Sequence, residues 1–562
     1  MRKKLAALLL CMCMVLSIVP AAAAADGGWS VESATWQDEN SVMLIWDGYD
    51  GGASYNIYRS DSADGRYELI GTSSVTSYLD GTAEWPEAMY YTVEPVAADG
   101  TALIRSAPIQ AGTNERHVSR VSVIMYHNFI TEADEAEGVE FEEYSLRPED
   151  FEADLQYLRD NGYTTITSDD VIDYINGVKP LPAKAVIISI DDGTEGVYKN
   201  AWPLLREYRA KADFNLIGAN VDAAWETVNE GGTRVGQSAP YCVWEELVDM
   251  EESGEINLCS HTYGLHVYNN DGRTGANMKD GETPEEYATV IAEDYALSVS
   301  CIGGWTGTDP TTMAYPYSRR SDTTDALILA NTGYEILMGG EGARGTAANY
   351  FVDGADPESQ KRIMSRPCRM EGSPISTYLD AIDATDAAAG VNTGEDTLNL
   401  SAQRCAEIAR WYSPYSDVAG SAWYAGAVYY AYVNGLLLGT SYTQFDPNGS
   451  LSRDMTATVL SRLAGENEVN IAGLEGGEAI TRAELAGALY ELAKELGYDT
   501  AARSATGFAD MDAVPEKFVD AVLWAEAKGI FEGGEDGRLR PMSELTRAEF
   551  ATVLMRWCTL YA

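Results

Sequence analysis

The chain has 562 residues, of which 45% are apolar and 22% charged, the composition of a globular protein with roughly three to five domains. Its formal net charge of −48 argues against a nucleic-acid-binding protein, because such a chain cannot neutralise a phosphate backbone. The charge fits a solvated extracellular surface and identifies no partner by itself.

The N-terminus has the three parts of a secretory signal: the basic "MRKK", the apolar "LAALLLCMCMVLSIVP" and the small-residue "AAAAADGG". We expect residues 1–25 to be a signal peptide that is removed near Ala24 or Ala25. A membrane anchor is the alternative, and the short apolar run argues against it. No later stretch is long and apolar enough to cross a bilayer, so the sequence predicts a secreted protein.

Six cysteines follow this segment, and none of them has a Cys-x-x-Cys spacing: Cys242, Cys259, Cys301, Cys368, Cys405 and Cys558. This scatter argues against a zinc ribbon or a dense disulfide framework. The sequence leaves undecided whether one disulfide forms within the 242–368 group.

Residues 28–112 contain short runs rich in Val, Ile, Tyr and Trp, separated by Gly and Asp turns. The pattern predicts an all-β sandwich. With Trp46 on an early strand, then "YNIYRS" and "YYTVEPVAADG", the segment resembles fibronectin type III domains. The resemblance implies a spacer or a carbohydrate-side accessory, and no chemistry is visible in the segment.

Residues 118–385 alternate between helical and strand patterns. "PEDFEADLQYLRDNGY" has apolar residues at helical spacing behind Pro148, and "AVIISI" predicts a buried strand. A helix through "AWPLLREYRA" and a strand at "ADFNLIG" follow. This alternation predicts a parallel α/β architecture.

A linker is expected at 386–400, and the chain from 401 to 562 is expected to be helical and repetitive. "AVYYAYVNG" matches "AVLWAEAKG" further along the chain, and "ITRAELAGALYEL" supplies a partial copy between them. Such periodicity indicates stacked copies of one small unit. The copies are expected at about 414–464, about 470–500 (truncated) and about 507–562.

Scarce histidines and an aspartate doublet occur at predicted strand ends. Asp191 and Asp192 follow "AVIISI", His127 follows "VSVIMY", and His261 and His266 lie in "SHTYGLH". Each could be structural on its own, but two imidazoles and a carboxylate form a common three-ligand metal set with a position left for water. Five residues would place the two histidines about 140° apart on a helix, so the pattern predicts a loop there.

The segment from about 120 to 380 resembles the polysaccharide deacetylase family (carbohydrate esterase family 4, NodB homology). Its Thr-Phe-Asp-Asp-Gly motif corresponds to 189–193, and its His-Ser/Thr-x-x-His motif corresponds to His261 and, one residue late, His266. The late histidine, together with His127 after a strand, is similar to the poly-N-acetylglucosamine deacetylase branch. The closing Pro-Tyr of a third motif corresponds to 316–317.

The resemblance implies a (β/α) barrel-like NodB domain with a divalent metal ion, zinc first, with cobalt, nickel or iron tolerated. It implies Asp191 as the general base, the backbone N–H of Tyr317 at the oxyanion and His127 as the acid for the leaving amine. The implied metal ligands are Asp192, His261 and His266. Ala314 stands where many members carry arginine, and the sequence assigns no role to Arg366.

"ITRAE" and "LTRAE" each place Thr three residues before Glu, which predicts capping boxes of Thr481 with Glu484 and of Thr546 with Glu549. An arginine follows each cap position, where a cation opposes the helix dipole, which indicates an anionic ligand or an ion pair. These arginines are Arg453, Arg482 and Arg547.

Residues from about 400 to 562 resemble S-layer homology domains, with openings at Ser416-Asp417 and Phe508-Ala509-Asp510. The resemblance implies an all-α module in which these arginines bind anionic secondary cell-wall polysaccharide. The whole chain is therefore expected to be a secreted polysaccharide N-deacetylase attached to the wall or S-layer of a bacterium. An O-acetyl (xylan-type) esterase and a non-catalytic wall-bound glycan-binding protein are the alternatives.

Overall fold

A computed structural model describes residues 31–562 except 39–40, 47, 50, 64, 84–88, 114–117, 345–347, 353–356, 358–359, 390–399, 465–473, 475, 506, 535 and 562. The expected signal peptide and most of the expected linker lie outside these residues. The chain divides into two compact units, Met1–Thr113 and Asn114–Ala562. None of the described helices has both the length and the apolar character needed to span a membrane.

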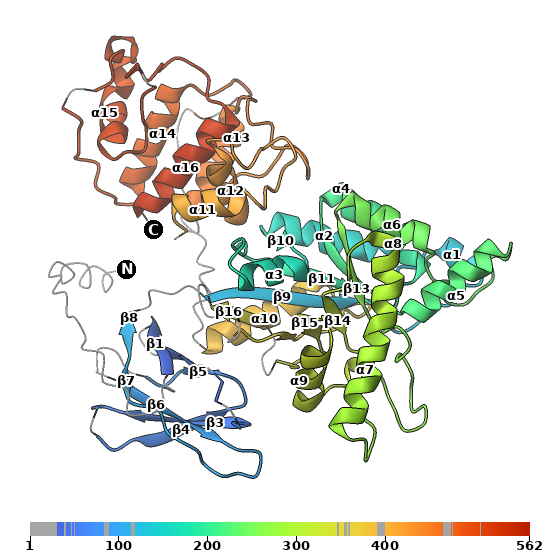
Figure 1. The fold of residues 1–562 in the computed structure, drawn as a ribbon. Helices are drawn as coiled ribbons and strands as arrows, with labels where there is room; N and C mark the ends of the chain where they lie inside the picture. The colour runs from blue at the N-terminus through green and yellow to red at the C-terminus, as the bar shows by residue number, and fades with distance from the viewer. Residues whose placement is uncertain are drawn as a thin grey trace. The chain divides into compact units, whose positions relative to one another are not determined.

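Two sheets, antiparallel except for the parallel β1–β8 pair, form the described part of the first unit, drawn in blue in Figure 1. One has the order β5-β2-β1-β8 and the other β4-β3-β6-β7. Trp46 is fully buried against Tyr55 from the facing sheet, as in the predicted sandwich. The strands are β1 (Val31–Asp38), β2 (Ser41–Trp46), β3 (Ser54–Ser60), β4 (Glu68–Ser73), β5 (Ser77–Asp80), β6 (Tyr90–Val96), β7 (Ile109–Gln110) and β8 (Gly112–Thr113).

A second sheet system, with the order β16-β9-β11-β12-β13-β14-β15-β17, carries the site. Its pairs are parallel except β16 with β9, and a parallel bridge from Met125 to Cys368 brings the chain after β17 back beside β9. The sheet is thus a nearly closed barrel. Its strands are β9 (Val118–Tyr126), β10 (Thr164–Thr165), β11 (Ala185–Ile190), β12 (Ala212–Leu216), β13 (Ile256–Ser260), β14 (Thr312–Ala314), β15 (Ile336–Met338), β16 (Asn349–Val352) and β17 (Ile363–Met364).

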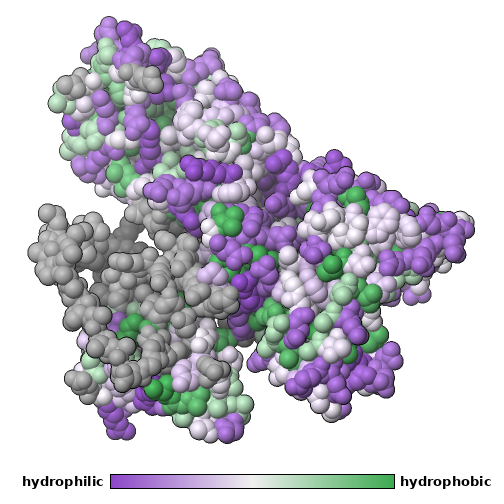
Figure 2. Space-filling model, in the orientation of Figure 1, coloured by the Kyte–Doolittle hydropathy of each residue, from purple (hydrophilic) through white to green (hydrophobic). Residues whose placement is uncertain are grey.

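Helices cover the outside of the barrel (Figure 1). The predicted helix behind Pro148 is confirmed as α2, with Phe151, Leu155 and Leu158 buried. The helices are α1 (Glu132–Ala136), α2 (Pro148–Asp160), α3 (Ser168–Ile175), α4 (Trp202–Tyr208), α5 (Gly218–Asn229), α6 (Trp244–Ser253), α7 (Pro284–Ser298), α8 (Gly304–Thr306), α9 (Asp322–Asn331) and α10 (Ile375–Ala389). Figure 2 shows hydrophilic side chains over much of the coloured surface, in keeping with the acidic composition.

The C-terminal part contains α11 (Ala402–Ala409), α12 (Ala425–Val433), α13 (Arg453–Ala464), α14 (Arg482–Glu495), α15 (Val519–Ala527) and α16 (Arg547–Tyr561). Both predicted capping boxes are confirmed. The first N–H of α13, α14 and α16 each bonds to the loop before another of these helices: Arg453 to Glu478, Arg482 to Ser543 and Arg547 to Gly449. These contacts link the three helices in a ring. A purely helical module stays a prediction, because part of the middle copy is not described.

Helix α12 packs against the barrel, and all nine of its residues are buried. Tyr432 Oη donates to the carbonyl of Tyr163 at 2.6 Å, and the N–H of Ala183 donates to Tyr429 Oη at 2.9 Å. Tyr163 and Ala183 precede β10 and β11. This contact, called the α12 interface below, therefore lies at the N-terminal ends of the barrel strands.

A substitution at Gly162 can test how closely α12 packs against the barrel. Gly162 has φ +74°, and an added Cβ would lie 2.6–2.7 Å from backbone atoms of Val433. Gly177 has φ +70° with nothing within 4 Å of its Cβ position, so Gly177→Ala is a matched control for backbone strain alone. We expect Gly162→Ala to cost about 1–3 kcal/mol more than Gly177→Ala, as overpacking does. Calorimetric unfolding measures this, and equal losses would contradict the packing.

Candidate active site

The barrel brings the predicted site residues together at the C-terminal ends of its strands. Asp191 and Asp192 follow β11, His261 follows β13, and His127 follows β9. Tyr317 lies three residues beyond β14. Parallel strands place such residues at one edge, where α/β barrels carry their chemistry.

Asp192, His261 and His266 form a group that could hold a metal ion. One ligand atom from each lies within 4.8 Å of the others. The Nε2 atoms of His261 and His266 are 3.7 and 3.6 Å from Asp192 Oδ1. Two imidazole nitrogens and one carboxylate oxygen match the donor set of a catalytic divalent metal.

The orientation of His261 suits a ligand. Its Nδ1 lies 2.9 Å from the carbonyl of Ala314, so Nδ1 carries the proton and Nε2 presents its lone pair to Asp192. Burial lowers the pKa of His261 to about 3, which keeps the imidazole neutral.

A loop presents the two histidines, as the five-residue spacing predicts. Asp294 on α7 accepts the N–H groups of Tyr263 at 2.9 Å and Gly264 at 2.8 Å. Thr262 Oγ1 accepts the N–H of Leu265. The loop is therefore fixed by a carboxylate that no sequence motif had identified.

Arg366 is the main residue that the sequence reading left without a role. Its Nη1 and Nη2 donate to Asp191 Oδ1 at 2.6 Å and Oδ2 at 2.9 Å, and Asn215 donates to Oδ1 at 2.8 Å. The Arg366 side chain is fully buried. It supplies a cation that Ala314, with its methyl side chain, cannot supply.

The two adjacent carboxylates differ in charge state because their surroundings differ. Burial acts to raise the pKa of Asp191, but Arg366 and then His261 outweigh it, so this pKa lies below its usual range. The Asp192 side chain is 25% exposed, yet desolvation by the surrounding protein, with the charge of Asp191 adding to it, raises its pKa to about 6. A cation beside Asp192 would reverse that shift.

His127 and Tyr317 are held by different neighbours. His127 stacks on Tyr144 with ring centroids 5.0 Å apart, and its Nδ1 lies 3.9 Å from Cys368 Sγ. Tyr317 has φ +57°, and its phenol oxygen is 3.2 Å from His266 Nδ1. Among the described residues, no acceptor bonds to the backbone N–H of Tyr317. All six cysteines after the signal segment are free.

The three repeat arginines have unequal surroundings. Arg453 pairs with Glu478 and Glu484, and Arg482 pairs with Glu549 at 2.7 Å. Arg547 is buried and donates to the carbonyls of Phe445 and Leu438. Acceptors within the chain therefore compensate much of the charge of these arginines. The sequence had left open whether an anionic ligand or an ion pair does so.

Residues 178–337 match the family model described as polysaccharide deacetylase, and residues 414–454 and 507–551 match the S-layer homology domain model. The first range contains Asp191, Asp192, both loop histidines and Tyr317.

Curated relatives match the same part of the chain. The poly-β-1,6-N-acetyl-D-glucosamine N-deacetylase of Escherichia coli (strain K12) is 28% identical over 227 residues, 38% of this chain. The match spans 33% of that relative's own length. The protein of the same name from Staphylococcus aureus (strain N315) is 26% identical over 214 residues, 38% of this chain and 68% of that one. A solved de-N-acetylase from Aggregatibacter actinomycetemcomitans is 22% identical, covers 47% of this chain and 99% of its own, and has a TM-score of 0.38.

The Arg366–Asp191 pair can be tested by a double-mutant cycle. Removing one partner of a buried ion pair costs about 3–5 kcal/mol, because the other charge stays buried and uncompensated. We expect Arg366→Gln to lose about this much unfolding free energy and Arg366→Gln/Asp191→Asn to regain a large part of it. Urea unfolding followed by tryptophan fluorescence measures the coupling. Strictly additive losses would show that the pair is not coupled.

Proposed function

Because the chain carries a polysaccharide deacetylase domain followed by S-layer homology domains, we propose that it is a wall-associated, metal-dependent deacetylase of an N-acetylglucosamine-containing glycan. One observation carries the proposal. Two adjacent carboxylates are divided between a buried guanidinium, which holds Asp191, and a pair of imidazoles, which face Asp192.

Asp191 is proposed as the general base. Arg366 keeps it ionised and holds both of its oxygens, so it can take a proton from a water on the side of Asp192. Asp192, His261 and His266 would hold the divalent metal, with zinc as the first candidate. When bound, that ion would polarise the acetyl carbonyl and lower the pKa of the attacking water.

The remaining roles fall to His127 and Tyr317. The N–H of Tyr317 projects from a left-handed turn beside His266 and would donate to the developing oxyanion. His127 would protonate the leaving amine, with its ring held by stacking on Tyr144.

Exposed aromatic rings near the site fit a sugar substrate. Tyr144, Tyr268 and Tyr317 are 44%, 73% and 43% exposed, and their ring faces can stack on the apolar faces of pyranose rings. The names of the Escherichia coli and Staphylococcus aureus relatives make poly-β-1,6-N-acetylglucosamine the first substrate to test.

We expect the metal-loaded protein to release acetate from N-acetylglucosamine oligomers, and Asp191→Asn to reduce this at least 10³-fold while the bound metal, measured by mass spectrometry, stays at the parental level. His261→Ala should lose both acetate release and bound metal, because it removes a proposed metal ligand. Full activity of Asp191→Asn would refute the proposed base.

The same assay separates the alternatives. Release from acetylated xylan but not from N-acetylated oligomers would favour the O-acetyl esterase. A metal-loaded protein inactive on every glycan of a broad panel would favour a wall-bound binding protein.

Wall attachment is proposed at a groove between repeats, called the repeat groove. It encloses about 340 Å³, and its lining includes Trp423, Arg482, Arg540 and Arg556. The Trp423 side chain is 71% exposed, and Arg482 Nε is buried without a hydrogen-bond partner among the described residues. Cations beside an exposed indole suit an anionic polysaccharide, and Arg482 has the spare donor. Arg453 and Arg547, the other two predicted contacts, would contribute less, because internal acceptors hold them.

We expect Arg482→Gln to weaken binding to isolated cell walls at least tenfold in a sedimentation assay. Arg453→Gln is the matched control, because it also breaks an arginine pair with a capping glutamate but lies outside the groove lining. Equal losses in both variants would assign these arginines a structural role only.

A further inference from the structure

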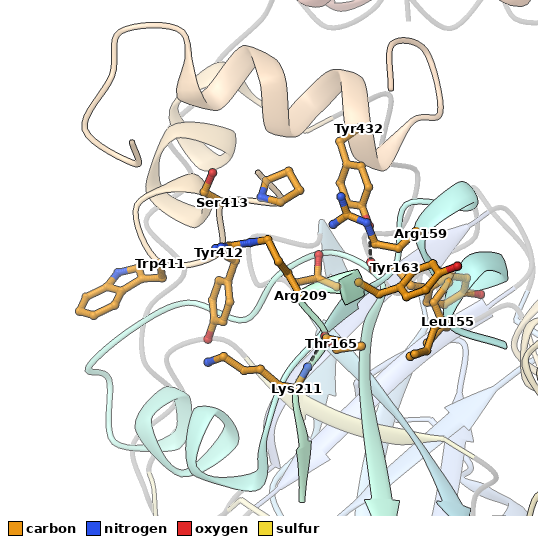
Figure 3. A pocket seen from close by; sticks show the side chains of 15 residues that line it. Leu155, Arg159, Tyr163, Thr165, Arg209, Lys211, Trp411, Tyr412, Ser413 and Tyr432 are labelled. Carbon is orange, nitrogen blue, oxygen red and sulfur yellow. Dashed lines mark hydrogen bonds between the residues drawn. The ribbon is translucent and has the colours of Figure 1, made fainter. Parts of the chain in front are cut away.

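A cavity, shown in Figure 3, lies beside the α12 interface. It is at the N-terminal ends of the barrel strands, opposite the end that carries the candidate active site. The barrel contributes the ends of α2 and α4 and the starts of β10 and β12, and the repeat module contributes the 411–414 loop and Tyr432. Its volume is about 130 Å³. Its lining includes Arg159, Tyr163, Arg209, Lys211, Trp411 and Tyr412.

The lining is cationic in a strongly acidic protein. It contains Arg159, Arg209 and Lys211 and no Asp or Glu, whereas the chain has 87 acidic and 39 basic residues. A cavity whose lining has three cations and no carboxylate favours an anion over a neutral or cationic ligand.

The cations have unused hydrogen-bonding capacity. Arg159 Nε is buried without a partner, and in the described part of the chain nothing bonds to or pairs with the Arg209 guanidinium. Lys211 lies 3.4 Å from Asp170, which is held more closely by Lys179 at 2.6 Å. Figure 3 shows Arg209 reaching toward Tyr412, between the 411–414 loop and Lys211.

Aromatic rings complete the wall. Trp411 is 55% exposed at the mouth, while Tyr412 and Tyr163 are buried. An indole at the mouth of a cationic cavity offers a stacking face for a sugar ring whose acidic substituent enters the cavity. A cavity of this volume takes such a substituent with part of one ring and is too small for a folded partner.

The cavity is separate from both proposed sites. Lys211 immediately precedes β12, and Asp191 immediately follows the parallel strand β11. Because Ala212 is in register with Ile188, Lys211 lies level with Ile187, four residues before Asp191, and about 13 Å separates the two positions along the strands. No residue of the repeat groove lines this cavity.

We propose that this interface cavity binds a carboxylated sugar residue of an acidic glycan, held by Arg209, Lys211 and Arg159 and stacked on Trp411. The ligand would bridge the barrel and the first repeat. Binding does not depend on deacetylase activity, so the two proposals fail separately.

Isothermal titration of the full chain with tetragalacturonate tests the proposal, with cellotetraose and sodium acetate as neutral-sugar and free-anion probes. We expect tetragalacturonate to bind at least tenfold more tightly than either. Equal binding of cellotetraose would remove the charge argument, and equal binding of acetate would mean an adventitious anion only.

The site is assigned with charge-matched variants. Arg209→Gln/Lys211→Gln should weaken tetragalacturonate binding at least tenfold, while Arg206→Gln/Lys199→Gln, on the same segment but outside the lining, should not. Trp411→Ala, at an exposed position, should also weaken it without lowering the unfolding temperature. Arg482→Gln should leave this affinity unchanged. If Arg482→Gln lowered the affinity for tetragalacturonate and the Arg209/Lys211 variant did not, the ligand would be assigned to the repeat groove and the proposal would be overturned.

Discussion

The buried pair of Arg366 with Asp191 is the constraint on which the site depends. Every nitrogen of the guanidinium is used: Nε on the carbonyl of Gly339, Nη1 on Ser189 and Asp191, and Nη2 on Asp191. The arginine follows β17, the last strand, and its partner follows β11. One bidentate interaction therefore joins the closing segment of the barrel to its centre and fixes the carboxylate proposed as the general base at the same time.

This pair also explains how two like charges occupy adjacent positions. Asp192 has φ +81° and is followed by Gly193 with φ +90°, so the backbone turns sharply after Asp191. The turn directs one carboxylate to the arginine inside the barrel and the other to the histidines at its mouth. A non-glycine residue in this conformation is strained, and such strain is typical of functional sites.

The sequence predicted the parts of the site that share local motifs. The strand-end doublet, the histidine pair in a loop and His127 all follow recognisable apolar runs. Arg366 gave no such signal, because it is 175 residues from Asp191 and follows a strand of only two residues. Asp294 was one acidic residue among many, and only the bonds to Tyr263 and Gly264 distinguish it.

The α12 interface could have been anticipated in part. "AGAVYYAYV" is apolar on every face, and a helix of that kind must be buried on all sides. Burial of α12 on all sides was therefore implied, but no pattern in the chain identified Tyr163 and Ala183 as its contacts. Contacts between distant segments depend on tertiary packing and produce no periodic pattern in the sequence.

The position of that interface bears on how a tethered enzyme would work. The repeat module contacts the N-terminal ends of the barrel strands, whereas the carboxylates and histidines lie at the C-terminal ends. Buried tyrosines with hydrogen-bonded hydroxyls make the contact specific, since misplacing α12 would leave those hydroxyls and the N–H of Ala183 unpaired. A module held on the wall through the repeat groove would then keep the catalytic mouth clear of its own attachment. Substrate selection would depend on the aromatic rings at that mouth. The interface cavity at the opposite end would bind a carboxylated sugar of an acidic polymer.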